Sequence, residues 1–284
     1  MVCRLSHIGL GLMVVAFLSG HQAMADTRQG EQAQCDNLQK QYDLETQMRA
    51  CDHLISQGNE TPPNLAIDYN DRAIIYIHRK DYVHAGQDLD ASIKLDPDYP
   101  YAYNSRGVVD RAFFDYDKAL DDLSNAIRLK PDYANAYTRR GIIFALKGDE
   151  ERALADLNRA IELHPDNGNY YNNRCFGLAI LGQWQKAIPD CDRSISMMPG
   201  NPDPFDSRGY AEQRAGNIDA AISDYTTALK IDPEYETSLF GRGVAYAARG
   251  KHELAAADIA AARRIYPSID RNMADKKILL PAGF

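Results

Sequence analysis

Proline recurs at one fixed period through most of this chain, and no other feature constrains the fold as strongly. A fixed period in the range of about 20 to 50 residues indicates a stack of similar units that bury a continuous core between neighbours. Such a stack presents a long groove in place of an enclosed pocket, so we expect binding before catalysis. Three residue types keep the period without a slip: Pro97, Pro131, Pro165, Pro199, Pro233 and Pro267; Ala85, Ala119, Ala153, Ala187, Ala221 and Ala255; and Arg72, Arg106, Arg140, Arg174, Arg208 and Arg242.

Each unit contains two segments with helical periodicity. Within a unit that ends two residues after its proline, apolar or small residues occupy positions 4, 8 and 11 and then 20, 24, 27 and 28. These spacings place them on one face of each of two successive helices. Glycine at position 15 of four units favours a turn between the helices, and the proline closes the second helix. The predicted repeats are residues 66–99, 100–133, 134–167, 168–201, 202–235 and 236–269.

This pattern resembles the tetratricopeptide repeat family. The third repeat carries it in full, with Tyr137, Gly141, Phe144, Gly148, Ala153, Leu157, Ala160 and Pro165. The resemblance covers residues 66–269 and implies an all-α fold, a right-handed α-solenoid of helix-turn-helix units. Five residues depart from the family pattern, and we expect them to alter local turns or packing only. They are Ala73 and Cys175 at position 8, Lys80 and Phe114 at position 15, and Asp110 at position 11.

The two ends of the chain differ from the repeats. Residues 1–25 have the basic start, short apolar stretch and small residues before a cleavage point that are typical of a secretory signal, with cleavage after Ala25. An uncleaved anchor stays open as an alternative. Residues 26–63 predict a degenerate helix pair that caps the first repeat, and residues 268–284 predict a C-terminal capping helix and tail. We therefore expect a periplasmic or secreted protein.

The cysteines of the expected mature chain form two pairs with the same spacing. Cys35 and Cys51 are separated by as many positions as Cys175 and Cys191, and paired cysteines in an exported protein indicate disulfides. Cys175 and Cys191 occupy positions 8 and 24, where small residues let the two helices of a repeat approach, and a disulfide needs Cα atoms within about 7 Å. We predict the bonds Cys35–Cys51 and Cys175–Cys191. Buried free thiols are the alternative.

Two further columns predict contacts that hold the helices together. Aspartate occupies position 23 of every repeat, where it can pair with the arginine at position 7 of its own repeat or with that of the next. Either spacing allows partly buried ion pairs between helices, so we assign this pair of columns a structural role. An aromatic column at position 4 predicts core packing and not a stacking platform for bases or sugars. Its members are Tyr69, Tyr103, Tyr137, Tyr171 and Phe205.

The resemblance implies a concave face lined by positions 2, 5, 6, 9, 12 and 13 of the first helices. Asparagine is frequent there, and its side chain can both donate to and accept from an extended peptide backbone. The arrangement is similar to the asparagine ladder of the tetratricopeptide region in O-linked N-acetylglucosamine transferases, although Thr138, Asp206 and Phe240 interrupt it. A solvated face without a ligand is the alternative. The candidate partner-binding residues are Asn70, Asn104, Asn135, Arg139, Asn169, Asn172, Asn173, Phe176, Tyr210 and Arg214.

Charge and motif content exclude several functional classes. The chain carries a formal net charge of −8, and loss of residues 1–25 would remove one arginine and no acid, which opposes binding to nucleic acid or to anionic membranes. The histidines share no metal-ligand spacing, and no phosphate-binding loop or nucleophile motif is present. We therefore expect no cofactor, no metal and no enzymatic activity.

These observations favour an exported scaffold or adaptor that binds a protein or peptide partner in the groove. An envelope assembly component that works through its ends or convex face is the first alternative, and self-association is compatible with it. A non-catalytic subunit of an envelope enzyme complex is the second.

Overall fold

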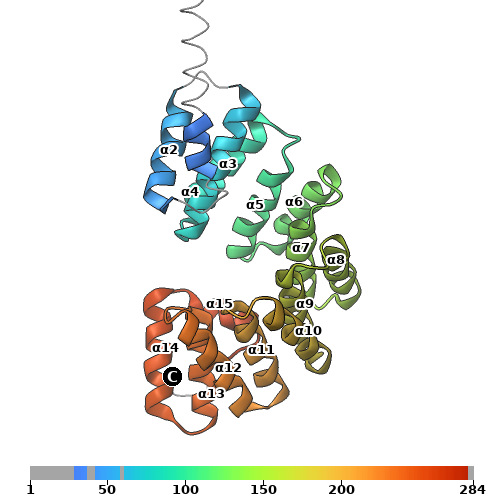
Figure 1. Ribbon diagram of the computed structural model, residues 1–284, viewed down its shortest axis with the longest axis vertical. Coiled ribbons are helices and arrows are strands. Elements are labelled where there is room, and N and C mark those ends of the chain that lie inside the picture. The colour runs from blue at the N-terminus through green and yellow to red at the C-terminus, as the bar shows by residue number, and fades with distance from the viewer. Residues whose placement is uncertain (1–28, 37–41, 58–60, 281–284) are drawn as a thin grey trace, which may run out of the picture. The chain divides into compact units, whose positions relative to one another are not determined.

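The computed structural model describes residues 29–36, 42–57 and 61–280, and every regular element in these ranges is a helix (Figure 1). The chain divides into an N-terminal unit that ends at Leu129 and a C-terminal unit that begins at Lys130. Each unit is a stack of helix pairs, so the predicted all-α fold of paired helices is confirmed. The predicted signal segment, residues 1–25, lies outside the described residues.

In the part of the N-terminal unit that the structure describes, two regular helix pairs follow a shorter cap. Successive helices pack against each other, and the first helices of the two pairs also contact one another. In the cap, residues 29–36 are helical, and Cys35, Cys51 and Leu54 form a buried cluster with Ile75. The helices that follow residues 29–36 are α2 (Leu44–Ser56), α3 (Pro62–His78), α4 (Tyr82–Leu95), α5 (Pro100–Ala112) and α6 (Tyr116–Leu129).

Over its described residues, 130–280, the C-terminal unit contains four helix pairs and one short terminal helix, α15 (Ile269–Asp275). The buried residues Ile269 and Met273 belong to α15, which packs against the last pair, α13 and α14. First helices of neighbouring pairs contact one another along this unit, as α9 contacts both α7 and α11. The paired helices are α7 (Ala134–Leu146) and α8 (Glu150–Leu163), α9 (Gly168–Ile180) and α10 (Trp184–Met197), α11 (Asp203–Ala215) and α12 (Ile218–Ile231), and α13 (Glu236–Ala248) and α14 (His252–Ile265).

The turn within each pair uses the left-handed backbone conformation at position 15. Gly148, Gly182, Gly216 and Gly250 adopt φ between 72° and 88° there. Lys80 and Phe114 replace glycine in the first two repeats, yet they adopt φ of 60° and 63°. The turn therefore keeps its geometry, although L-amino acids reach this conformation only at an energetic cost.

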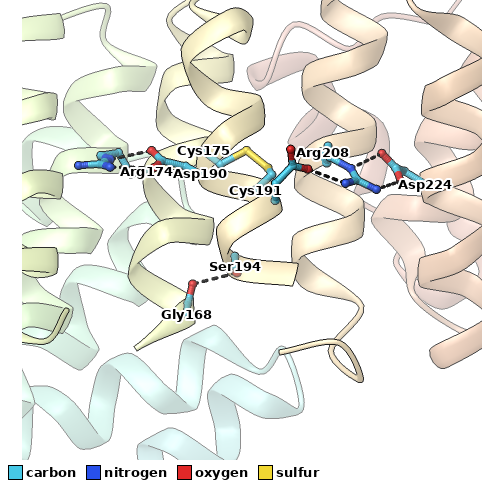
Figure 2. The surroundings of a disulfide bond; sticks show 9 residues. Gly168, Arg174, Cys175, Asp190, Cys191, Ser194, Arg208 and Asp224 are labelled. Atoms are coloured by element: carbon cyan, nitrogen blue, oxygen red, sulfur yellow. Dashed lines mark hydrogen bonds and ion pairs between the residues drawn. A yellow bond between two sulfur atoms is a disulfide. The ribbon is translucent and has the colours of Figure 1, made fainter. Parts of the chain in front are cut away.

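The two helices of a pair approach most closely where position 8 meets position 24. A Cβ atom built on Gly107 would lie 2.9 Å from Leu123 Cγ, and one built on Gly243 would lie 2.7 Å from Ile259 Cγ1. Cys175 and Cys191 occupy the same two positions and form a disulfide between α9 and α10, with Cα atoms 5.4 Å apart (Figure 2). Cys35 and Cys51 form the second disulfide, with Cα atoms 4.9 Å apart.

Arginine and aspartate join the helices within each repeat. Arg208 Nε and Nη2 donate to the two carboxylate oxygens of Asp224 at 2.9 and 2.7 Å, and its Nη1 reaches Asp192 of the preceding repeat at 2.6 Å (Figure 2). The bidentate pair thus forms with the aspartate of the same repeat. The same pair recurs as Arg72–Asp88, Arg106–Asp122, Arg140–Asp156, Arg174–Asp190 and Arg242–Asp258.

The aromatic column at position 4 lies against these arginines. Its residues are half-buried, and Tyr137 packs against a buried core cluster, as the expectation of core packing requires. The guanidinium carbon of Arg72 lies 5.5 Å from the ring centre of Tyr69, and that of Arg208 lies 6.0 Å from Phe205. Each ring therefore covers one side of a partly buried cation and adds a cation–π contact.

We predict that Asp156→Asn lowers the free energy of unfolding by about 2–3 kcal/mol, because it replaces the carboxylate in the bidentate pair with Arg140 by a neutral amide in a partly buried site. Urea unfolding measures the change. Asp132→Asn is the matched control, since Asp132 pairs with Lys130 while its side chain is 70% exposed, and it should leave the midpoint unchanged. A loss of partner binding by Asp156→Asn at unchanged stability would contradict the structural role.

For the disulfide between α9 and α10, we predict that Cys175→Ala with Cys191→Ala lowers the free energy of unfolding by about 3 kcal/mol, the value expected for a cross-link across a loop of about 15 residues. Cys175→Gly with Cys191→Leu restores the residue pair found in the second and third repeats, so it should recover about 1–2 kcal/mol of packing. Urea unfolding without reductant should give that order of stability. Free thiols in the purified protein, detected by intact mass, would contradict the prediction.

Candidate binding surface

Three of the predicted groove asparagines are buried. Asn70, Asn104 and Asn172 are 2%, 6% and 9% exposed, and the Oδ1 atom of each is enclosed without a hydrogen-bond donor. All three occupy position 5. The residue at this position in the fifth repeat, Asp206, accepts hydrogen bonds from Ser238 at the start of the next first helix. Position 5 therefore lies toward the neighbouring repeat, and these asparagines do not form an open ladder for a peptide.

The other predicted residues lie on the first helices of the C-terminal unit, on α7, α9 and α11. Asn135 and Asn169 are exposed, whereas Arg139, Asn173, Phe176 and Arg214 are half-buried and Tyr210 is 3% exposed. We call these seven residues the first-helix surface. At one end, Tyr170 donates to Asn135 Oδ1 at 3.0 Å, and Asn173 Nδ2 donates to the backbone oxygen of Asn169 at 2.8 Å.

At the other end of the first-helix surface, the chain binds its own C-terminal segment. The Tyr210 hydroxyl donates to the backbone oxygen of Lys276 at 2.7 Å, and Arg214 Nη1 donates to the backbone oxygen of Lys277 at 3.2 Å. Burial raises the pKa of Tyr210 to about 12, so its hydroxyl keeps the proton that it donates. Residues 276–280, which we call the C-terminal segment, thus follow α15 onto residues predicted to bind a partner.

Side chains of the C-terminal segment also contact this surface. The ammonium of Lys276 lies 5.5 Å from the ring centre of Phe176, and that ring lies 5.6 Å from the ring of Tyr210. Ile278 is 5% exposed, whereas the next residue, Leu279, is 68% exposed. The contact therefore uses one cation on an aromatic pair and one buried aliphatic side chain.

A carboxylate provides negative charge near Lys276. Asp206 accepts from Ser238 Oγ at 2.6 Å and from Thr237 Oγ1 at 3.1 Å. Burial raises the pKa of Asp206 to about 6, and the nearby Lys276 ammonium opposes that rise. Asp206 is therefore ionised at neutral pH, and acidification below pH 6 neutralises it.

The N-terminal unit has a different polar arrangement on its first helices. Asp71 on α3 accepts from Gln32 Nε2 at 3.2 Å and from Asn70 Nδ2 at 3.3 Å. Burial, together with the neighbouring Asp36 and Asp68 carboxylates, raises the pKa of Asp71 to about 7. The cap therefore contacts this part of α3, and among the residues that the structure describes, the predicted residues that reach the surface lie in the C-terminal unit.

Sequence reasoning missed two contributors to this surface. Tyr170 stands at position 3, which the repeat pattern assigns to no face in particular. The C-terminal segment lies more than 60 residues from Tyr210 and Arg214 along the chain, and it carries no repeat pattern that could link it to them. Its sole signal is the pair of lysines followed by apolar residues.

No group of three or more histidine, cysteine, aspartate or glutamate side chains in the described ranges is arranged to hold a metal ion. In the same part of the chain, no helix combines the length and apolar character needed to cross a membrane.

Comparison with known proteins identifies the repeats. Residues 134–167 and 207–268 each match a family described as tetratricopeptide repeat, and residues 115–148 match one described as TPR repeat. No curated protein matches the chain. Two separate stretches of the sequence, residues 115–167 and 207–268, thus carry the repeat, independently of the helix packing.

Solved structures share the fold at low sequence identity. The chain is similar to a tetratricopeptide repeat protein from Parabacteroides merdae ATCC 43184, with 14% identity and a TM-score of 0.67 over 89% of this chain and 99% of that one. A chain of the APC/C hetero-tetramer Cut9-Hcn1 is 16% identical, with a TM-score of 0.61 over 91% of this chain and 55% of that one. PilW, a type IV pilus biogenesis factor, is 20% identical, with a TM-score of 0.56 over 72% of this chain and 94% of that one. The repeat matches therefore show tetratricopeptide repeats in residues 115–167 and 207–268, and the stacked helix pairs have the fold of solved tetratricopeptide repeat structures.

Proposed function

We propose that this protein is an exported, non-catalytic scaffold that binds a partner protein through an extended segment held on the first-helix surface. One observation carries the proposal: the surface already holds a non-helical segment of its own chain by two backbone carbonyl oxygens. Contacts to backbone oxygens do not depend on the side chains of the bound segment, so they suit a peptide supplied by another protein. The aromatic pair and Arg214 add the residue types that are enriched at protein interfaces.

Export is supported by two independent features. Residues 1–25 have the pattern of a secretory signal, and the chain contains two disulfides, which persist in oxidising compartments such as the periplasm. Partner binding is the expected use of stacked helix pairs, and the matched Cut9-Hcn1 structure is itself a hetero-tetramer. We place the protein and its partner in the periplasm or outside the cell.

A second candidate is an assembly component that works through another face. The N-terminal unit has a cleft of about 680 Å³ lined by residues of α4, α5 and α6. Val83 and Phe113 at this cleft are 60% and 53% exposed, and burial raises the pKa of Asp110 beside them to about 6. Exposed apolar side chains of this size favour a docking role for this cleft. A role as non-catalytic subunit of an envelope enzyme complex fits either surface.

Crosslinking capture from the periplasm distinguishes the two candidates. We predict that the double variant Arg139→Ala with Asn169→Ala captures at least about tenfold less partner than the native chain, because these side chains lie on the first-helix surface beyond the C-terminal segment. Val83→Ala with Phe113→Ala is the matched control and should retain the partner. The reverse result would assign the partner to the N-terminal cleft, and thermal unfolding of both variants excludes a folding defect.

The charge of Asp206 gives a prediction for stability. Its pKa is raised to about 6 in the folded chain, so the folded state holds the proton more tightly than the unfolded state and loses stability as pH rises from about 4 to 6. Asp206→Asn removes this titration. When the pH rises from 4 to 7, the free energy of unfolding of the variant should therefore increase, relative to that of the native chain, by an amount on the order of 1 kcal/mol. Urea unfolding at the two pH values measures it, and a constant difference would contradict the prediction.

A further inference from the structure

We propose that the C-terminal segment, residues 276–280, is a built-in competitor for the first-helix surface, and that the partner is a peptide carrying a lysine followed two residues later by a buried aliphatic side chain. This inference rests on the proposed function and names its ligand chemistry. The bound peptide would replace the C-terminal segment residue for residue. Access of the partner then depends on how firmly the segment is docked.

The main chain of the segment is held by donors from one helix. Tyr210 and Arg214 stand one turn apart on α11, and they donate to the backbone oxygens of two successive residues, Lys276 and Lys277. Two donors at this spacing fix the direction and register of a bound chain. Any peptide that presents two successive carbonyl oxygens in the same geometry satisfies both.

Side-chain contacts define the partner more narrowly. The Lys276 ammonium lies over Phe176, and Asp206 supplies negative charge nearby. Ile278 is almost fully buried, whereas Leu279 projects to solvent. A competing peptide therefore needs a cation that lies over the Phe176 ring and an aliphatic side chain that fills the buried site of Ile278.

The segment can leave without removing the helix that precedes it. α15 is anchored by Ile269 and Met273, which are 0% and 2% exposed and belong to a different surface. Within the segment, Lys277 adopts φ of 61° and its amide donates to the backbone oxygen of Ala274, so it forms the left-handed C-terminal turn of α15. Ile278 N donates to the backbone oxygen of Met273 across the same turn, so undocking opens this turn while Ile269 and Met273 keep α15 packed.

The test compares two full-length variants at adjacent residues. Ile278→Asp places a charge at a buried site and should undock the segment, whereas Leu279→Asp changes an exposed residue in the same way. The probe is a labelled peptide with the sequence of residues 275–280, and its binding is followed by fluorescence anisotropy. We expect Ile278→Asp to bind the probe at least about tenfold more tightly than the native chain and Leu279→Asp. Unchanged thermal unfolding of the repeats shows that the fold is intact.

A third variant acts in the opposite direction. Lys277→Gly removes the side chain from the left-handed position, so it should dock the segment more firmly and weaken probe binding by about threefold or more. A probe in which glutamate replaces the residue equivalent to Lys276 should bind no variant, because it loses the cation and meets Asp206. Binding of that probe by Ile278→Asp would overturn the proposed partner chemistry.

The remaining outcomes separate this inference from the proposed function. Equal binding of the probe by the native chain and by both aspartate variants would overturn competition, while the first-helix surface would still bind peptide. If a folded Ile278→Asp chain does not bind the labelled peptide, the proposed ligand chemistry is overturned. The proposed function is then tested by the crosslinking capture experiment alone. A native dimer abolished by Ile278→Asp would assign the segment to a second copy of this chain and overturn the proposal.

Discussion

The bidentate pair between the arginine at position 7 and the aspartate at position 23 fixes the geometry on which each repeat depends. Two parallel hydrogen bonds set both the separation and the rotation of the two helices, as Arg208 and Asp224 illustrate, and a third reaches the preceding repeat. A partly buried guanidinium adds little net stability, but it strongly disfavours any register that leaves it unpaired. This column of ion pairs thus acts mainly on specificity, and it decides which side of each first helix faces outward.

Close packing at positions 8 and 24 completes the joint that the ion pair begins. Gly107 and Gly243 admit a large aliphatic partner at a distance where a Cβ atom would collide. Cys175 and Cys191 place a covalent bond at the same point, beside the pair formed by Arg174 and Asp190 (Figure 2). A small residue is required in either case, so the disulfide replaces an apolar contact without changing the approach of the helices.

The parts of the structure that were predictable are those set by the repeat period. The helix pairs and the joining of arginine and aspartate columns follow from spacing, because each recurs in every repeat. Spacing left open whether the arginine pairs within its own repeat, as Arg208 and Asp224 do, or with a neighbouring one. The burial of Asn70, Asn104 and Asn172 was missed because it depends on how closely the following first helix approaches, which no spacing encodes. The docked C-terminal segment was missed for a related reason: its contacts are non-local, and residues 276–280 have no periodicity to place them.

Because the first-helix surface already holds the C-terminal segment, a partner has to make more contacts than that segment in order to displace it. Two hydrogen bonds, one cation over a ring and one buried isoleucine suffice for the C-terminal segment because its attachment to α15 gives it a high effective concentration. A free peptide with the same contacts lacks that advantage. A successful partner therefore has to extend beyond the segment, and the exposed Asn169 and Asn135 lie on α9 and α7, the next first helices along the unit. The length of the partner segment, more than its affinity for any one residue, then determines whether it displaces the C-terminal segment from the first-helix surface.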